Sequence, residues 1–451
     1  MEPAVVCVDV GSTFTKAAAI TGDGSVLATA QHPTTVGTDV LAGLDAAVTA
    51  LGLGRVPDDR VVACSSAGGG LRLAVVGQER VISAEAGRRV ALSAGARVVA
   101  VSAGMVDAAG VAHLVDAHPD VVLLVGGTDG GDTEVLLHNA EALGRAPLRG
   151  PVVVAGNAEV ADRAAGLAGG RRRAVHVAPN VIPRIGVLAP APARQAIREM
   201  FIRHVIGGKG LSRGPRFPRL VAAATPDAVL VGIEVVAEAL AARPGATGDV
   251  MAVDVGGATT DVYSVLEPQE APRDAVETLW HGRTVEGDLG MRWSAPDVVV
   301  AARSERLVPP ATGGRGAPTP HPLEAAARRR HDDVGFLPRD PAEMDVDLTL
   351  ARLAAVTAVR RHARPGPEGV RDLSRVGLLI GSGGVLRHAA ADDARTVLDA
   401  VLGDYAGGWR VPERAAVIID RRYLLAPIGL LSLSGRAGTA RSLAEVLLDG
   451  Q

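Results

Sequence analysis

Apolar residues at the start of the chain fall into three short runs separated by polar turns. Val5 to Val10 is a β-branched run, and a second run extends from Thr15 to Ile20. The sequence Thr-Gly-Asp-Gly at 21–24 favours a tight hairpin turn, and a third run covers Ser25 to Ala30. This pattern predicts an antiparallel meander of three strands.

The same pattern returns 245 residues later. Residues 250–265 align with residues 5–20 without a gap, so Asp254 and Gly256 occupy the places of Asp9 and Gly11. A repeat with so wide a spacing indicates two copies of one domain and not a solenoid of short repeats.

Between the two copies, apolar runs alternate with helical patterns. The runs Asp120 to Val125 and Pro151 to Ala155 predict buried strands, and the spacing of apolar residues from Ala193 to His204 predicts an amphipathic helix. A glycine-rich segment follows the first of these strands, at 126–131. Glycines and prolines at 207–218 indicate a linker.

After the second copy, residues 308–341 are rich in proline, glycine and arginine. This composition predicts a loop, with a short helix at Leu323 to Arg330. A buried strand is predicted from Val376 to Ile380, followed by a Gly-Ser-Gly-Gly turn at 381–384 and a helix, and a last helix near Thr439 to Leu448. Strands that alternate with helices predict an α/β protein.

Length and charge narrow the class of protein. A chain of 451 residues is too long for one ordinary core, so we expect two or more domains. The formal net charge of −3 and the 2% of aromatic residues do not suit a nucleic-acid partner. Asp9 interrupts the N-terminal apolar run, and no run approaches the roughly 20 residues of a membrane helix. We therefore expect a cytoplasmic protein without a nucleic-acid or membrane partner.

The first turn of the meander carries groups that suit a phosphate. Backbone N–H groups of a glycine-containing turn such as the one at Gly11 form a concavity for phosphate oxygens. Ser12 and Thr13 add hydroxyl donors, and Lys16 adds a full positive charge in a chain whose cations are nearly all arginine. Asp9, at the strand end, can hold the waters of a bound Mg²⁺. An ordinary hairpin with a polar turn is an equally good interpretation of this turn alone.

The second turn offers the same kinds of group. They are Asp254, Gly256, Gly257, Thr259, Thr260 and Asp261. A carboxylate beside a phosphate and a metal ion can polarise an attacking water, which is the positioning that phosphoryl transfer requires. Two matching turns favour a clamp on one nucleotide. Gly381, Gly383 and Gly384, in the later glycine turn, would let the backbone lie flat against an adenosine, although such a turn alone is a weak signal.

These three motifs, in this order, resemble the actin-like ATPase (ASKHA) superfamily of actin, sugar kinases, acetate kinase and heat-shock chaperone ATPases. The resemblance implies two ribonuclease-H-like lobes with an inserted αβ region, and ATP with Mg²⁺ as cofactors. Asp9, Asp254 and Asp261 would be catalytic, with Asp9 and Asp254 at the metal. We expect a first lobe core at 1–84, the inserted region at 85–215 and the second lobe at 216–451.

A narrower resemblance rests on five segments of the chain. They are 64–70, 123–131, 180–187, 283–291 and 424–431. These segments are similar to the glutamate mutase accessory proteins of the GlmL or MutL type, which are unrelated to the mismatch-repair protein of similar name. The resemblance implies a reactivating, chaperone-like ATPase whose partners are subunits of an adenosylcobalamin-dependent mutase. Pro427 departs from the family pattern, where a small residue is expected.

Several other residues keep two interpretations. Glu286 and Asp288 can line a cleft or belong to a solvated turn. Asp129 and Asp132 can bind a metal, but Asx turns are favoured. The remaining candidates, for which a structural role is favoured, are His281 and Cys64.

Two enzyme classes remain as alternatives to the accessory ATPase. A small-molecule kinase would use the same cleft, and an ATP-dependent hydantoinase or oxoprolinase has similar glycine-rich strand ends. A protein that holds nucleotide without hydrolysing it is also compatible with these motifs.

Overall fold

The computed structural model describes residues 5–80, 82–170, 173–207, 210–266, 281–308, 322–364 and 371–450. By contacts within the chain, it divides into two compact units. Of the described residues, unit 1 comprises those within Met1–Val235 and Leu425–Val446. Unit 2 comprises Val236–Glu267, Trp280–Leu424 and Leu447–Gln451.

Unit 1 contains a mixed five-stranded sheet that begins with the predicted meander. Its order is β10-β4-β1-β2-β3, in which β1 to β3 run antiparallel and β4 and β10 run parallel to β1. The strands are β1 (Val5–Val10), β2 (Phe14–Ile20), β3 (Val26–Pro33), β4 (Val61–Ser65) and β10 (Val221–Ala224). The meander predicted from the apolar runs is confirmed.

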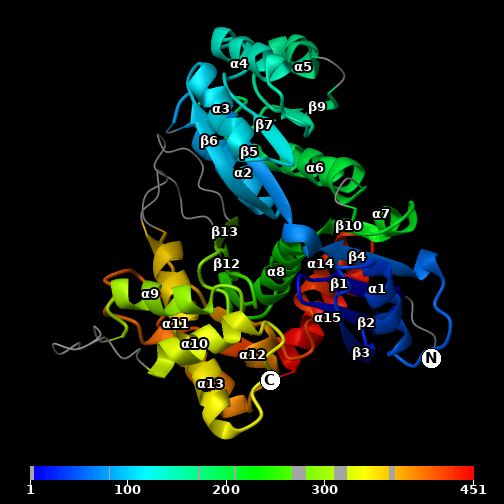
Figure 1. Cartoon of the computed structure of the whole chain (residues 1–451), viewed down its shortest axis with the longest axis vertical. Helices are drawn as coiled ribbons and strands as arrows, with labels where there is room; N and C mark the ends of the chain where they lie inside the picture. Colours follow the sequence, from blue (N-terminus) through cyan, green and yellow to red (C-terminus); the bar gives the residue numbers. More distant parts are fainter. Residues whose placement is uncertain are drawn as a thin grey trace. The chain divides into compact units, whose positions relative to one another are not determined.

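Helices cover both faces of this sheet. Because side chains alternate along a strand, Val6 and Val8 face α1, whereas Cys7 faces α14, where its thiol donates to the carbonyl of Pro427. The helices of this part are α1 (Val40–Thr49), α7 (Arg216–Leu220), α8 (Thr225–Ala241), α14 (Leu425–Leu433) and α15 (Ala437–Asp449). Figure 1 shows α14 and α15 in red beside the blue strands of this unit.

Close packing of α8 on α14 depends on glycine. A Cβ on Gly232 would lie 2.0 Å from the carbonyl oxygen of Leu425, and one on Gly429 would lie 1.8 Å from that of Ala228. Pro427 lies in the first turn of α14, where a helix tolerates the missing N–H.

A second sheet of unit 1 is wholly parallel and lies between β4 and β10 in the chain. Its order, β6-β5-β7-β8-β9, is the doubly wound order 2-1-3-4-5. The strands are β5 (Leu71–Gly77), β6 (Ala96–Ala103), β7 (Val121–Leu124), β8 (Val152–Val154) and β9 (Val175–Val177). This is the inserted αβ region, and its first strand begins before the expected boundary at residue 85.

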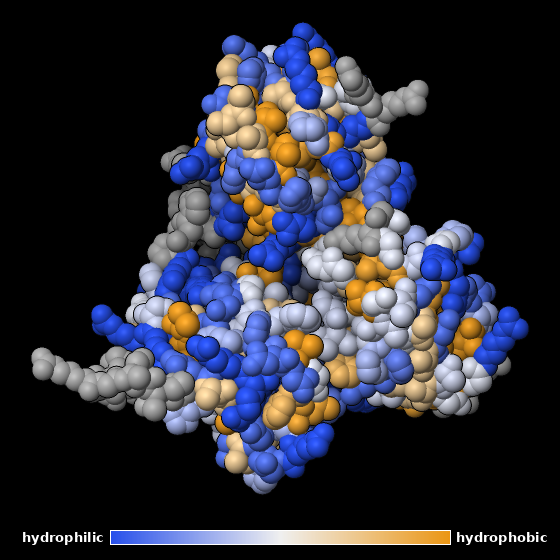
Figure 2. All heavy atoms as spheres, viewed as in Figure 1, coloured by the Kyte–Doolittle hydropathy of each residue, from blue (hydrophilic) through white to orange (hydrophobic). Residues whose placement is uncertain are grey.

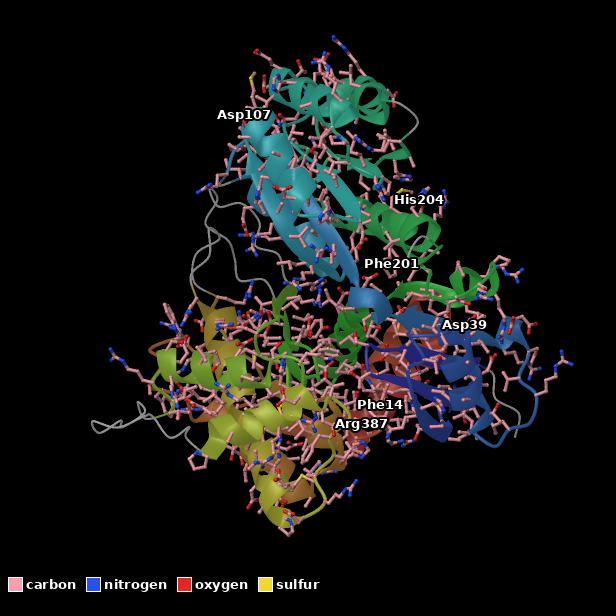
Figure 3. The ribbon with its side chains drawn as sticks, viewed as in Figure 1. Phe14, Asp39, Asp107, Phe201, His204 and Arg387 are labelled. Atoms are coloured by element: carbon pink, nitrogen blue, oxygen red, sulfur yellow. The ribbon has the colours of Figure 1, made fainter. Side chains whose placement is uncertain are left out.

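The helices of the inserted region pack on both faces of this parallel sheet. Side chains of α2 and α6 pack in one hydrophobic cluster, on one face of the parallel sheet. Side chains of α3, α4 and α5 pack in a second cluster, on the other face. The helices are α2 (Ser83–Ser93), α3 (Ala108–Asp116), α4 (Glu134–Arg145), α5 (Ala161–Gly169) and α6 (Pro190–Met200). Asp39 and Asp107, marked in Figure 3, cap α1 and α3 by accepting from Leu41 N at 2.9 Å and Gly110 N at 2.8 Å.

The helix predicted over Ala193 to His204 begins earlier and changes form. It runs as α6 to Met200, and a wider helical turn continues from Phe201 to Ile206. Within the predicted linker 207–218, α7 begins at Arg216. Short helical turns elsewhere in unit 1 are Asp58–Arg60, Ala67–Gly69 and Ala158–Val160.

Unit 2 contains a mixed five-stranded sheet with the same strand order as the mixed sheet of unit 1, and it has no counterpart of the parallel sheet among the described residues. Its order is β13-β12-β11-β14-β15, with β11 to β13 antiparallel and β14 and β15 parallel to β11. The strands are β11 (Val250–Val255), β12 (Thr260–Val265), β13 (His281–Glu286), β14 (Leu378–Ser382) and β15 (Ala416–Ile419). The ribonuclease-H-like architecture expected for two lobes is confirmed.

The helices of unit 2 close its core around α11. They are α9 (Ala295–Ser304), α10 (Pro322–Asp332), α11 (Pro341–Ala363), α12 (Gly384–His388) and α13 (Ala391–Leu402). The short helix predicted at Leu323 to Arg330 is α10, and the predicted last helix is α15. The part of the expected loop at 309–321 lies outside the described residues.

The contact division differs from the expected lobes at two places. Residues 216–235 and 425–446 belong to unit 1, although they follow residue 215 in the sequence. They supply strand β10 to the first sheet, and they supply α14 and most of α8 to the helices that cover this sheet. The three-part division into domains stays a prediction.

The hydropathy of the surface and of the helices can be compared with that of typical globular and membrane proteins. On the face in Figure 2, hydrophilic side chains alternate with small hydrophobic patches, as on most proteins. Within the described ranges, no helix is long and apolar enough to cross a membrane.

Candidate functional site

The turn between β1 and β2, with the strand residues beside it, is called the first half-site. Its members are Asp9, Gly11, Ser12, Thr13 and Lys16. Strand pairing places Asp9 opposite Lys16, and the Asp9 Oδ2 atom lies 3.4 Å from Lys16 Nζ. The other carboxylate oxygen of Asp9 accepts from the Thr225 hydroxyl at 2.5 Å and from the Cys64 thiol at 3.5 Å. Asp9 is therefore buried, at 3% exposure, and held by three neighbours.

Gly11 is required by the turn itself. Its N–H donates to the carbonyl of Phe14 at 3.1 Å, and a Cβ on Gly11 would lie 2.7 Å from the same oxygen. Phe14 is marked at the start of β2 in Figure 3. The exposed Ser12 donates its hydroxyl to the carbonyl of Ser66, and the Thr13 carbonyl accepts from Thr34 N.

The turn between β11 and β12 is the second half-site. Its members are Asp254, Gly256, Gly257, Thr259, Thr260 and Asp261. The turn closes as the first one does, because Gly256 N donates to the Thr259 carbonyl at 2.9 Å. A Cβ on Gly256 would lie 2.9 Å from that carbonyl oxygen. Residues 256–259 are partly exposed, and at Gly256 and Gly257 the exposed surface is backbone.

Two carboxylates face each other in the second half-site. Strand pairing places Asp254 opposite Asp261, where the first half-site has Asp9 opposite Lys16. The Oδ1 atom of Asp261 accepts from Arg283 Nε at 3.0 Å and from Arg283 Nη2 at 2.6 Å. Its Oδ2 atom accepts from the Thr259 hydroxyl at 2.9 Å. Both oxygens of Asp261 are therefore engaged within the protein.

Residues 287–293, called the strap, are bonded along the second turn. Met291 N donates to the Gly256 carbonyl at 3.0 Å, and Arg292 N and Trp293 N donate to the Gly257 carbonyl at 2.8 and 3.0 Å. The Thr260 hydroxyl donates to the carbonyl of Leu289 at 2.6 Å. The strap also lies against the turn at Gly290, where a Cβ would lie 2.4 Å from the carbonyl carbon and oxygen of Ala258. The fully buried Thr260 thus has a structural partner in the strap.

Helix α11 holds the strap at both ends. Arg361 Nη1 and Nη2 donate to Asp288 at 2.7 and 2.8 Å, and Arg361 Nη1 also donates to Glu286 at 2.7 Å. At the other end, Arg292 Nη2 donates to Asp347 at 2.9 Å. The hydrogen bonds from Arg361 lower the pKa of Asp288, whereas burial raises the pKa of Glu286. These two acids are parts of the strap's anchor, and not of a freely solvated turn.

The predicted glycine turn begins two residues later than expected. Gly381 is inside β14, and a Cβ there would lie 2.6 Å from Leu398 Cδ1 of α13, so packing accounts for this glycine. Gly383 has φ of +106°, and a Cβ there would lie 2.2 Å from the carbonyl oxygen of Val255. The turn is therefore next to the end of β11, which carries Asp254. Gly384 is exposed, with open space around it.

The other candidate residues have structural partners. Asp132 forms an Asx turn with Glu134 N at 3.2 Å and also accepts from Gln78, and Asp129 accepts from Ala158 N and Asn180. No group of three or more His, Cys, Asp or Glu side chains in the described part of the chain can hold a metal ion.

Neither cysteine is suited to nucleophilic chemistry. Burial, with the Asp9 charge as a second cause, raises the pKa of Cys64 well above its ordinary value, and burial raises the pKa of Cys7 to about 12. Because the thiolate is the nucleophile, both cysteines act as buried packing residues.

Sequence reasoning missed two partners of the predicted acids. Thr225 comes 216 residues after Asp9 and carries no local motif. Arg283 opens one of the segments on which the narrower resemblance rests, and that was its only signal. The structure brings the first half-site together in unit 1, and the second half-site and Gly383 together in unit 2.

Comparison with known proteins decides the family. The model of a family described as MutL protein matches residues 5–447 of this chain. The chain belongs to the MutL protein family. A member named Protein MutL, from Clostridium tetanomorphum, is 33% identical over 450 residues, which cover 95% of this chain and 96% of the relative.

Solved structures resemble this MutL family member only distantly. Nucleotide-free acetone carboxylase has a TM-score of 0.40 and 13% identity, with 95% of this chain and 70% of that chain covered. The nucleotide-free diol dehydratase-reactivating factor has a TM-score of 0.36 and 12% identity, with coverage of 97% and 100%. Likenesses at this level say nothing about what the MutL family member binds.

Proposed function

We propose that this protein binds Mg²⁺·ATP through its two half-sites together and hydrolyses it, as an accessory ATPase of an adenosylcobalamin-dependent carbon-skeleton mutase. The observation that supports this most is the duplication. Each unit contains a sheet of the same strand order, and in each sheet the equivalent hairpin is closed by an equivalent N–H to carbonyl hydrogen bond. Two unrelated hairpins would have no reason to match in register, turn and acidic residue.

The residues of the turns suit a triphosphate. The strap bonds to the carbonyls of Gly256 and Gly257 and so holds the partly exposed turn in place. The N–H of Gly257 would meet a phosphate oxygen, because the N–H of Gly256 already donates to the Thr259 carbonyl. Lys16 is half-buried beside Asp9 and can reach a phosphate oxygen with little loss of side-chain freedom. Preorganised donors of this kind stabilise the charge that develops in phosphoryl transfer.

The acidic residues suit Mg²⁺ better than a metal with an all-protein ligand set. Mg²⁺ is usually held by one or two carboxylates together with substrate phosphates and waters. Asp9 and Asp254 supply oxygen ligands at equivalent strand ends, and no larger cluster of ligands occurs among the residues described. When bound, the ion would neutralise phosphate charge. Asp254, which is less buried than Asp9, would orient the attacking water, with Asp261 beside it.

The partner follows from the resemblance to glutamate mutase accessory proteins. The inserted region, which contains the parallel sheet of β5 to β9, would contact the mutase because the first sheet is complete without it. ATP binding can change the grip on a partner only if ATP prefers one arrangement of the protein over another.

The test is capture of a purified mutase subunit by this protein with ATP, with ADP and without nucleotide, alongside release of phosphate. We expect capture that differs between nucleotide states and phosphate release that the mutase alters. Capture in no state would contradict the accessory role. Stoichiometric transfer of labelled phosphate to a metabolite would indicate the kinase class, and turnover that requires a cyclic amide would indicate the hydantoinase class.

A further inference from the structure

The two half-sites carry different charges at one equivalent position. The offset of 245 places Asp261 where Lys16 stands in the first copy, and both pair across the strand with the acidic residue of their own half-site. Like charges directly opposite each other on neighbouring strands are destabilising. The second half-site therefore needs a positive charge from elsewhere.

Arg283 supplies this charge from the third strand. It pairs with Tyr263 on β12, two residues from Asp261 and on the same face of the sheet. Its side chain is only 3% exposed, and its guanidinium carbon lies 5.7 Å from the centre of the Tyr263 ring. In unit 1 the equivalent place, opposite Ala18 on β3, is occupied by Thr29. The arginine is thus particular to the second copy.

The geometry also fixes the orientation of Asp261. Two N–H groups of Arg283 hold one carboxylate oxygen, and the Thr259 hydroxyl holds the other. A carboxylate held on both oxygens keeps a single orientation. Asp254 therefore lies opposite a carboxylate that is held in place.

We infer that Arg283 is a positioning residue, which holds Asp261 in one orientation beside Asp254 so that the second half-site carries a net negative charge that strengthens binding of the divalent cation. This inference rests on the proposed function. Asp9 with Lys16 is neutral in sum, whereas Asp254, Asp261 and Arg283 together leave one negative charge. The first half-site, which has no net negative charge, then repels phosphate less than the second does.

The test measures cation binding directly, in the full chain, with Mn²⁺ as a spectroscopic substitute for Mg²⁺. Free Mn²⁺ is followed by electron paramagnetic resonance as it is titrated into protein that holds a non-hydrolysable ATP analogue. The variants are Arg283→Met, Arg283→Lys and the double variant Asp261→Asn with Arg283→Met. Arg360→Met is the matched control, because Arg360 is 3% exposed and donates to Asp404 through two N–H groups at 2.6 Å.

We expect Arg283→Met to weaken Mn²⁺ binding on the order of 10–100-fold, the usual effect of removing a residue that orients a metal ligand. Arg283→Lys should recover part of this loss, and Arg360→Met should bind Mn²⁺ as the wild type does. The double variant should stay weak, because the oriented carboxylate is still missing.

Three results would overturn the inference: wild-type Mn²⁺ binding in folded Arg283→Met, an equal loss in Arg360→Met, or full recovery in the double variant. If Arg283→Met does not fold, Arg283→Lys carries the comparison. Wild-type protein that binds neither the nucleotide nor Mn²⁺ would instead overturn the proposed function itself.

Discussion

Asp9 and Asp254 occupy equivalent strand ends but have different surroundings. Asp9 is buried, and its neighbours Thr225 and Lys16 come from other strands or strand ends. Asp254 is partly exposed and faces a second carboxylate. At the scale of single residues, the two acids are therefore expected to contribute separately to one reaction.

Substitution of either acid tests this assignment. Asp9→Asn and Asp254→Asn should each lower the rate of Mg²⁺·ATP hydrolysis on the order of 10²–10³-fold, because each removes a charge that positions the metal and water. Phosphate release in a steady-state assay measures the effect. Asp59→Asn and Asp392→Asn replace exposed acids of the same two units and should leave the rate unchanged. Wild-type turnover in either Asp9→Asn or Asp254→Asn would refute the site.

At the scale of elements, the hairpins could be predicted from sequence and their supports could not. A hairpin is specified by residues next to one another, so alternation and turn chemistry locate it. The strap, Arg283 and Thr225 reach the hairpins across other strands, and no local pattern encodes these contacts. The same limit explains Gly381, which a local pattern assigns to a turn, although packing against Leu398 of α13 keeps it inside β14.

The turn after β14 gives a matched pair of glycines. Gly383→Ala should lower the free energy of unfolding by about 1–3 kcal/mol or more, because φ of +106° is strained for alanine and the new Cβ would meet Val255. Gly384→Ala should change it by less than about 0.5 kcal/mol, because the space around Gly384 is open. Denaturant unfolding measures both. Equal effects would mean that the strained turn is misassigned.

His362 ties α11 to two strands of unit 2. Its ring nitrogens lie 2.9 Å from the Ser264 hydroxyl and 3.0 Å from the Thr284 hydroxyl. Burial, with Arg371 as a second cause, lowers the pKa of His362 well below its ordinary value of 6.5. The unfolded chain therefore binds a proton below pH 6.5 that the folded protein does not bind.

The contribution of His362 to stability should accordingly be complete above pH 6.5 and fall as the pH decreases. The contribution of His362 is a loss of about 1.4 kcal/mol per pH unit below 6.5, until the pKa of the folded state is reached. His362→Gln removes this proton-linked term, so its unfolding free energy should depend less steeply on pH between 6.5 and 5. Parallel profiles for the two proteins, from denaturant unfolding at each pH, would contradict this assignment.

At the scale of the whole molecule, one five-stranded sheet occurs in both units, and in unit 1 a second sheet is inserted into it. Each unit contains a five-stranded sheet of the same order, and only unit 1 contains the additional parallel sheet. Duplication explains why each unit carries an equivalent turn and acidic residue. The copies differ in Lys16 of one and Asp261 with Arg283 of the other, and under our proposal this difference would give them different roles in binding.

Calorimetric titration of the full chain with a non-hydrolysable ATP analogue and Mg²⁺ tests most directly our proposal that both half-sites bind one nucleotide. We expect one nucleotide per chain, with an affinity that is reduced severalfold or more both by Lys16→Met in unit 1 and by Asp254→Asn in unit 2. Two independent nucleotides per chain, or an affinity that ignores one of the two substitutions, would contradict it.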